Sequence, residues 1–151
     1  MWFMNKILNP LVHLILRSPL HGMMSATLLL VTYAGRKSGK EYTLPVQYVQ
    51  DERIIYIVPG APEKKTWWRN FRHVHPVQLW LKGKSVTGEA IVLDGDVEAE
   101  EVMRALNLYL QRFPSVAKMR GIRFDGDGLF NQEDIRRTAS TTIIVRVILN
   151  S

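Results

Sequence analysis

Hydrophobic and polar residues alternate along several short segments of the chain, and this alternation predicts β-strands. We expect strands over residues 27–33, 42–50 and 54–58, where β-branched and aromatic residues are frequent. The connections between them are short, and the first carries Gly35 and Gly39, so these strands should form an antiparallel meander. Further strands are expected over residues 77–81 and 85–93, joined by a turn at Gly83, and over residues 141–149.

A helical spacing follows in residues 96–113. Its apolar positions recur at intervals of three and four, at Met103, Leu106, Leu110 and Phe113. We expect Asp96 to cap this helix and Pro114 to end it, and the apolar side to pack against the sheet. The pattern predicts one α+β domain over residues 1–151, with six antiparallel strands curled into a small barrel and flanking helices.

The N-terminal residues 1–31 are the most apolar part of the chain. Pro10, Arg17 and Pro19 interrupt them well before the roughly 20 apolar residues that a membrane-spanning helix needs. Within residues 1–17, Ile7 and Leu11 belong to an apolar stripe that predicts an amphipathic helix. We expect this helix to pack at the substrate end of the site, and peripheral contact with an anionic membrane is the alternative.

The composition is that of a folded protein, with 46% hydrophobic and 23% charged residues among 151. No cysteine is present, which excludes disulfide scaffolds, thiolate zinc sites and iron–sulfur clusters and fits a reducing compartment such as the cytoplasm. The net charge is +6, and residues 36–84 alone hold ten basic and four acidic residues. Such a local positive field favours an anionic partner. Nucleic acid is disfavoured, because the strands carry Val and Leu where aromatic side chains would stack on bases.

Two segments are candidates for ligand binding. The first contains Arg36, Lys37, Ser38, Gly39 and Lys40. It is not a P-loop, because only three residues separate its glycines and Glu41 follows the lysine, but glycine amides beside cations suit an anion.

The second segment spans residues 59–70. We expect Pro59, Gly60, Ala61 and Pro62 to form an open loop with free amides, and Thr66 to start a short helix that carries Trp67 and Trp68. At least one of these indoles should lie in the core. Together the two segments predict a site with a basic end and an amide-lined aromatic end. Neither His73 with His75 nor the run that begins at Asp125 has the ligand spacing of a metal site.

Three motifs together resemble the deazaflavin-dependent nitroreductase family: residues 35–40, residues 42–46 and residues 65–70, within a similarity that covers residues 9–88. The resemblance implies an FMN-binding-like split β-barrel that binds coenzyme F420, with the basic turn at the phosphate and anionic tail, and strand and loop residues at the ring. The cofactor-binding residues that it implies are Arg36, Lys37, Ser38, Gly39, Lys40, Thr43, Pro45, Val46, Pro59, Gly60, Ala61, Pro62, Lys65, Thr66, Trp67, Trp68 and Asn70.

The function that the resemblance implies is an F420H2-dependent oxidoreductase. The deazaflavin would pass a hydride to an electron-poor small molecule such as a quinone, nitroaromatic or enone, and the protein would supply no catalytic residue of its own. The alternatives are an FMN-binding split-barrel oxidoreductase and a non-enzymatic protein that binds a cofactor or lipid. A homodimer is expected. Val116 and Ala117 stand where relatives active on nitro compounds carry tyrosines, and residues 121–131 look like an insertion, so the substrate stays open.

Overall fold

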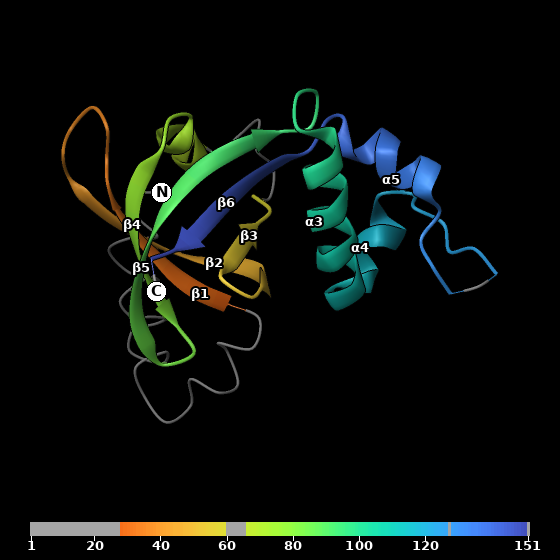
Figure 1. The fold of residues 1–151 in the computed structure, drawn as a ribbon, viewed down its shortest axis with the longest axis horizontal. Helices are drawn as coiled ribbons and strands as arrows, with labels where there is room; N and C mark the ends of the chain where they lie inside the picture. The colour runs from red at the N-terminus through yellow and green to blue at the C-terminus, as the bar shows by residue number, and fades with distance from the viewer. Residues whose placement is uncertain (1–27, 60–65, 127, 151) are drawn as a thin grey trace.

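Six strands form a closed antiparallel barrel in the computed structural model, which describes residues 28–59, 66–126 and 128–150. The strands are β1 (Leu28–Ala34), β2 (Glu41–Asp51), β3 (Ile54–Ile57), β4 (His75–Leu81), β5 (Lys84–Asp94) and β6 (Ile143–Leu149). Their order around the barrel is β1-β2-β3-β6-β5-β4 (Figure 1). The predicted α+β split barrel is therefore confirmed. The predicted N-terminal helix lies outside the described residues and stays a prediction.

The strand ends differ from the predicted ones by a few residues. β6 begins at Ile143 rather than at residue 141, because the hydroxyl of the buried Thr142 donates a hydrogen bond of 2.6 Å to the carbonyl of Thr138. This bond keeps Thr142 in the turn that follows the preceding helix. β4 begins at His75, two residues earlier than predicted, and includes Pro76.

The interior of the barrel is filled by every second residue of each strand, as the two-residue period of a strand requires. Leu29, Val31 and Tyr33 of β1 point inward, and a short 3-10 helix, η2 (Trp67–Phe71), closes one end of the barrel. The Phe71 ring lies 5.1 Å from the Tyr33 ring and belongs to the same core cluster. The helix that begins after Thr66 is as predicted.

A second core lies between the outer side of the barrel and three helices, α3 (Ala99–Arg112), α4 (Pro114–Met119) and α5 (Gln132–Ala139) (Figure 1). α3 buries Leu106 and Leu110 as predicted, but Met103 and Phe113 are only half-buried. Val102, Ala105 and Tyr109 are buried in their place. The buried side is wider than the predicted stripe because α3 contacts both the sheet and α5.

The predicted cap of α3 is wrong. Asp96 lies in a turn in which the amides of Val97 and Glu98 donate to the carbonyl of Asp94, so the helix begins at Ala99 with Glu98 as its N-cap. None of the helices that the structure describes is long and apolar enough to cross a membrane.

Candidate functional site

The basic turn between β1 and β2 is held by its own backbone. The Gly35 amide donates to the Lys40 carbonyl at 2.7 Å, the Gly39 amide donates to the Gly35 carbonyl at 2.9 Å, and the Lys40 amide donates to Ser38 Oγ at 3.2 Å. Gly39 has a φ of 70°, which glycine adopts without strain. The amides of Lys37 and Ser38 have no hydrogen-bond partner among the described residues, so both suit donation to a bound anion.

Asn70 joins this turn to η2. Its Oδ1 accepts a hydrogen bond of 3.0 Å from the Arg36 amide, and its Nδ2 donates to the Trp67 carbonyl at 2.8 Å. The turn and η2 are therefore fixed relative to each other, although 34 residues separate Arg36 from Asn70. Of the predicted loop over residues 59–62, Pro59 is buried two residues after the end of β3, whereas Gly60, Ala61, Pro62 and also Lys65 lie outside the described residues.

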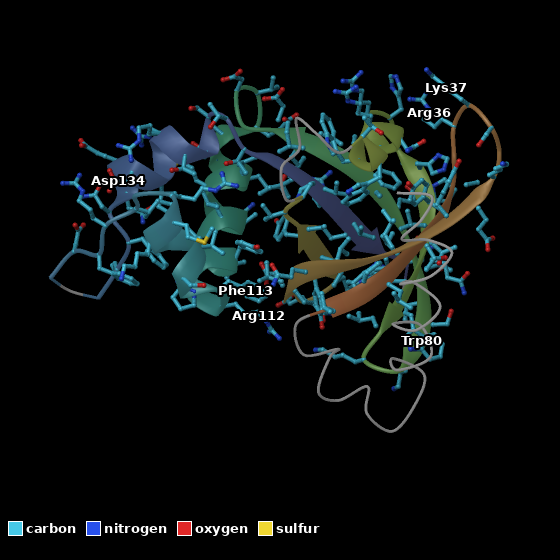
Figure 2. The ribbon with its side chains drawn as sticks, turned by 180° about the vertical axis from the view of Figure 1, so that it is seen from behind. Arg36, Lys37, Trp80, Arg112, Phe113 and Asp134 are labelled. Atoms are coloured by element: carbon cyan, nitrogen blue, oxygen red, sulfur yellow. The ribbon has the colours of Figure 1, made fainter. Side chains whose placement is uncertain are left out.

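Cations gather where the turn and η2 meet. Arg36, Lys37 and Lys40 are exposed on the turn, and Arg69 and Arg72 are exposed on and directly after η2. None of the five forms an ion pair with a carboxylate of the described residues. Figure 2 shows Arg36 and Lys37 at this end of the barrel. The five residues, called the cationic cluster below, form a concentration of positive charge that described acidic side chains leave unneutralised.

Both indoles of η2 belong to the core. Trp67 is 6% exposed and Trp68 is 8% exposed, and both lie in the barrel cluster. The guanidinium carbons of Arg69 and Arg72 lie 5.5 and 5.7 Å from the centre of the Trp68 ring. Trp68 therefore makes cation–π contacts with both guanidinium groups. Thr66, the N-cap of η2, is exposed and makes no side-chain capping bond.

The predicted residues of β2 point to opposite sides of the barrel wall. Val46 packs against the interior cluster that contains Leu44 and Tyr48, so Thr43 and Pro45 face outward because side chains alternate along a strand. The hydroxyl oxygens of Thr43 and Thr32 lie 2.9 Å apart on neighbouring strands. Thr43 and Pro45 thus share one outer surface, which begins near the basic turn.

Gln47 and Tyr109, which the sequence did not single out, extend this surface together with Phe113. Tyr109 of α3 donates a hydrogen bond of 2.9 Å to Gln47 Oε1 of β2, and the Phe113 ring lies 4.9 Å from the Tyr109 ring. Burial raises the pKa of the Tyr109 phenol, with a smaller opposing effect of Arg120, so the hydroxyl stays protonated and donates. The only signal in the sequence for this part of the surface was strand alternation, which places Gln47 on the same outer face as Pro45, two residues earlier.

The outer face of β2 therefore has two chemically different ends. The cationic cluster lies beside its start, and Gln47 with Tyr109 lies about 13 Å further along than Thr43, at the rise of a strand. Half-buried Pro45 lies between them. This arrangement suits an elongated ligand with an anionic part and a flat apolar part.

A cavity of about 280 Å³ lies elsewhere, on the outer side of β5 and β6, and contains none of the predicted site residues.

Two solved structures are similar to this fold. One is described as a domain-swapped dimer, with a TM-score of 0.56, 19% sequence identity, and coverage of 80% of this chain and 79% of that chain. The other is an F420-H2 dependent reductase, FDR-A, with a TM-score of 0.55, 19% identity, and coverage of 80% of this chain and 93% of that chain. At this identity they show the fold alone.

No curated protein matches the chain significantly. The family model of the F420H2-dependent quinone reductases matches residues 17–117, a span that holds the basic turn, β2, η2 and nearly all of the residues that flank the outer face of β2. Because this match covers most of the chain, the protein belongs to the F420H2-dependent quinone reductase family.

Proposed function

We propose that this protein reduces a quinone with F420H2, and that the cofactor lies along the outer face of β2 with its anionic tail at the cationic cluster. Family membership makes the protein an F420-dependent oxidoreductase, and the quinone is the acceptor that the family description names. The observation that carries the proposal is the bond between Asn70 and the Arg36 amide, which unites the cations of the turn with those of η2.

The residues present fit this cofactor. F420 carries a phosphodiester and a glutamate tail, so it needs several cations and hydrogen-bond donors close together. The amides of Lys37 and Ser38, which bond to no described residue, suit a phosphate oxygen, and the cationic cluster suits the carboxylates of the tail. Pro45 and Thr43 would orient the ring on the strand face. Cations without a described acidic partner lose no existing ion pair when an anion binds.

The protein's own role is to orient and to exclude water. When bound, the reduced deazaflavin supplies the hydride. Tyr109 and Phe113 would shield the acceptor side from solvent, since both rings flank the strand face. Because Tyr109 O–H donates to Gln47 Oε1, the amide Nε2 of Gln47, which has no partner among the described residues, is left to donate to a quinone oxygen.

The remaining expectations stand as parts of this proposal. We propose that the protein is a homodimer and that the N-terminal segment covers the acceptor side. FMN is the competing cofactor. A phosphate on a short ribityl chain would engage the turn alone, whereas the tail of F420 would also need Arg69 and Arg72.

The test is a titration of the purified protein with F420 and, separately, with FMN, followed by oxidation of F420H2 by a soluble naphthoquinone. We expect F420 to bind more tightly than FMN, and Lys37→Glu to weaken F420 binding more than tenfold, at least about 1.4 kcal/mol. Lys118→Glu on α4 is the control and should bind F420 normally. Gln47→Leu should raise KM for the quinone and leave F420 affinity unchanged. Tighter binding of FMN, or normal binding by Lys37→Glu, would contradict the proposal.

A further inference from the structure

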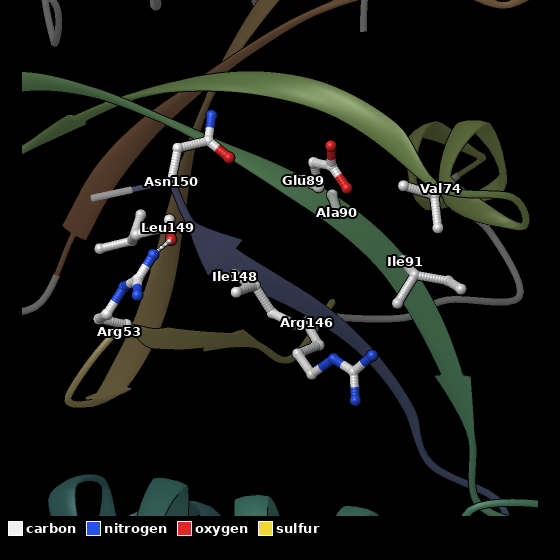
Figure 3. A pocket seen from close by; sticks show the side chains of 9 residues that line it. All are labelled: Arg53, Val74, Glu89, Ala90, Ile91, Arg146, Ile148, Leu149 and Asn150. Carbon is white, nitrogen blue, oxygen red and sulfur yellow. Dashed lines mark hydrogen bonds between the residues drawn. The ribbon is translucent and has the colours of Figure 1, made fainter.

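The outer face of β3, β6 and β5 exposes aliphatic side chains where α3 does not cover it. Ile148 at the middle of this face is 43% exposed, and Val74 at its edge is 59% exposed. They line the hollow of about 280 Å³, together with half-buried Ile91 (Figure 3). This surface, called the β6 face below, lies outside the proposed cofactor site. Exposed aliphatic groups that line one hollow make it a candidate contact surface.

The charges on the β6 face are arranged on two sides of Ile148. Strand register pairs Ile148 with Ile54 on β3 and with Glu89 on β5, so Ile148 lies between the two neighbouring strands. Arg53 lies on the β3 side, and its Nη2 donates a hydrogen bond of 2.8 Å to the Leu149 carbonyl. Glu89 is exposed on the β5 side. Neither Arg53 nor Glu89 forms an ion pair within the described part of the chain.

From this arrangement we infer that the β6 face is the contact between two copies of this chain. A two-fold axis that runs along β6 above Ile148 brings this residue against the same residue of the partner subunit. The same rotation places the β3 side of each copy over the β5 side of the other, so Arg53 of each copy faces Glu89 of the partner subunit. The contact is thus self-complementary in shape and charge, as an isologous interface requires.

The inference rests on the homodimer proposed above and adds which surface forms it. The other candidate occupant of the hollow is a small carboxylate, because Arg146 at its floor has a buried Nε without a hydrogen-bond partner among the described residues. A carboxylate in the hollow predicts a monomer, since it would fill the space that the second copy needs. The oligomeric state therefore separates the two occupants.

The experiment uses reversal of charge and measures mass by light scattering over a dilution series. Arg53→Glu alone puts the new glutamate of each copy opposite Glu89 of the partner subunit, so the dimer would contain two repulsive glutamate pairs. Glu89→Arg alone would create two repulsive arginine pairs in the same way. We expect each variant to raise the dimer dissociation constant at least about a hundredfold. An equimolar mixture of the two variants restores both pairs, because each contact then joins a glutamate to an arginine. The mixture should dimerise as the wild type does.

Matched controls separate this effect from loss of folding. Glu100→Arg, an exposed charge reversal on α3, should dimerise normally. Ile148→Lys should dissociate the dimer, while Val97→Lys, at a position that is 77% exposed elsewhere, should not. The proposal is overturned if the single variants dimerise normally or if their mixture stays monomeric. A wild type that is monomeric throughout would overturn it as well, while normal F420 binding in the same samples would leave the proposed function intact.

Discussion

At the scale of single residues, Asn70 determines the geometry of the candidate site. One amide side chain accepts from the Arg36 backbone and donates to the Trp67 backbone. The Asn70 side chain therefore holds the exposed turn in a fixed position relative to η2 and its buried indoles. A hydrogen bond of this kind contributes about 1 kcal/mol to stability, and more when its loss leaves a buried partner unsatisfied.

We expect Asn70→Ala to lower the free energy of unfolding by about 1–2 kcal/mol and to weaken F420 binding about tenfold, because the turn loses its attachment. Urea denaturation and F420 titration measure the two effects. Asn107→Ala is the control, since Asn107 also donates to a backbone carbonyl, that of Met103, but lies on α3. It should lose stability and keep F420 affinity. Equal affinity in both variants would contradict the role assigned to Asn70.

A second residue-scale feature is the buried carboxylate of Asp134. Its oxygens accept from the side chain and the amide of Arg123 and from the Arg137 guanidinium. The hydrogen bonds from Arg123, side chain first, lower the pKa of Asp134 from 3.8 to about 2. The folded state thus holds the carboxylate ionised at pH values where the unfolded chain already takes up a proton.

The resulting stability is fully present above the unfolded pKa of about 4 and is lost as the pH falls toward 2. Asp134→Asn should therefore unfold at a lower urea concentration than the wild type at pH 7, and the difference should shrink between pH 4 and pH 2. Glu133→Gln, which changes the exposed neighbouring carboxylate, should show no such difference. A difference that stays constant with pH would argue against this assignment.

At the scale of elements, the junction between the barrel and the helices depends on close packing of backbone. Gly95, in the turn between β5 and α3, is buried against the end of α5. A methyl group at this position would overlap the carbonyl oxygen of Ala139. The turn can approach the helix only because it carries no side chain there.

Gly95→Ala should cost at least about 3 kcal/mol, because neither the turn nor the backbone of α5 can move away without losing its own hydrogen bonds. Gly126→Ala is the matched control, since nothing lies within 4 Å of its added methyl group. Thermal unfolding of both variants tests the prediction. Similar melting temperatures for the two variants would show that α5 is not packed tightly on this turn.

At the scale of the whole molecule, the net charge of +6 is concentrated where the cofactor is proposed to bind. Exposed charges act over about 10 Å at 0.1 M salt, so the five members of the cationic cluster add their fields at one end of the barrel. Charge on the opposite, helical side includes the carboxylates of Asp134 and Glu101, which are neutralised by ion pairs with arginines.

We expect the F420 affinity of the wild type to fall as the salt concentration rises from 50 to 500 mM. The double variant Arg69→Gln/Arg72→Gln should bind F420 more weakly at low salt, and its affinity should fall less steeply with salt. The double variant Lys84→Gln/Lys118→Gln removes the same charge from exposed positions elsewhere and should keep the wild-type slope. The measurement is fluorescence titration at several salt concentrations. Identical slopes for both double variants would show that total charge, rather than the cluster, governs binding.

The sequence alone determined the elements whose signals are local. The strands, the turn at Gly35–Lys40 and the start of η2 follow from alternation and turn residues within a few positions, and the predicted bounds are correct to within two residues. The family resemblance also depends on motifs that are continuous in the chain. Such features are determined by neighbouring residues, because backbone preference and side-chain period act over short distances.

Tertiary structure alone decided the relations between distant residues. The bond from Arg36 to Asn70 spans 34 residues and that from Tyr109 to Gln47 spans 62, and neither position has a local signal for its partner. The burial of both Trp67 and Trp68, which the sequence left open, is decided by the closed end of the barrel. The β6 face exists only because β3 and β5 lie on either side of β6. These features depend on register and closure of the sheet, which long-range packing determines and a local pattern cannot specify.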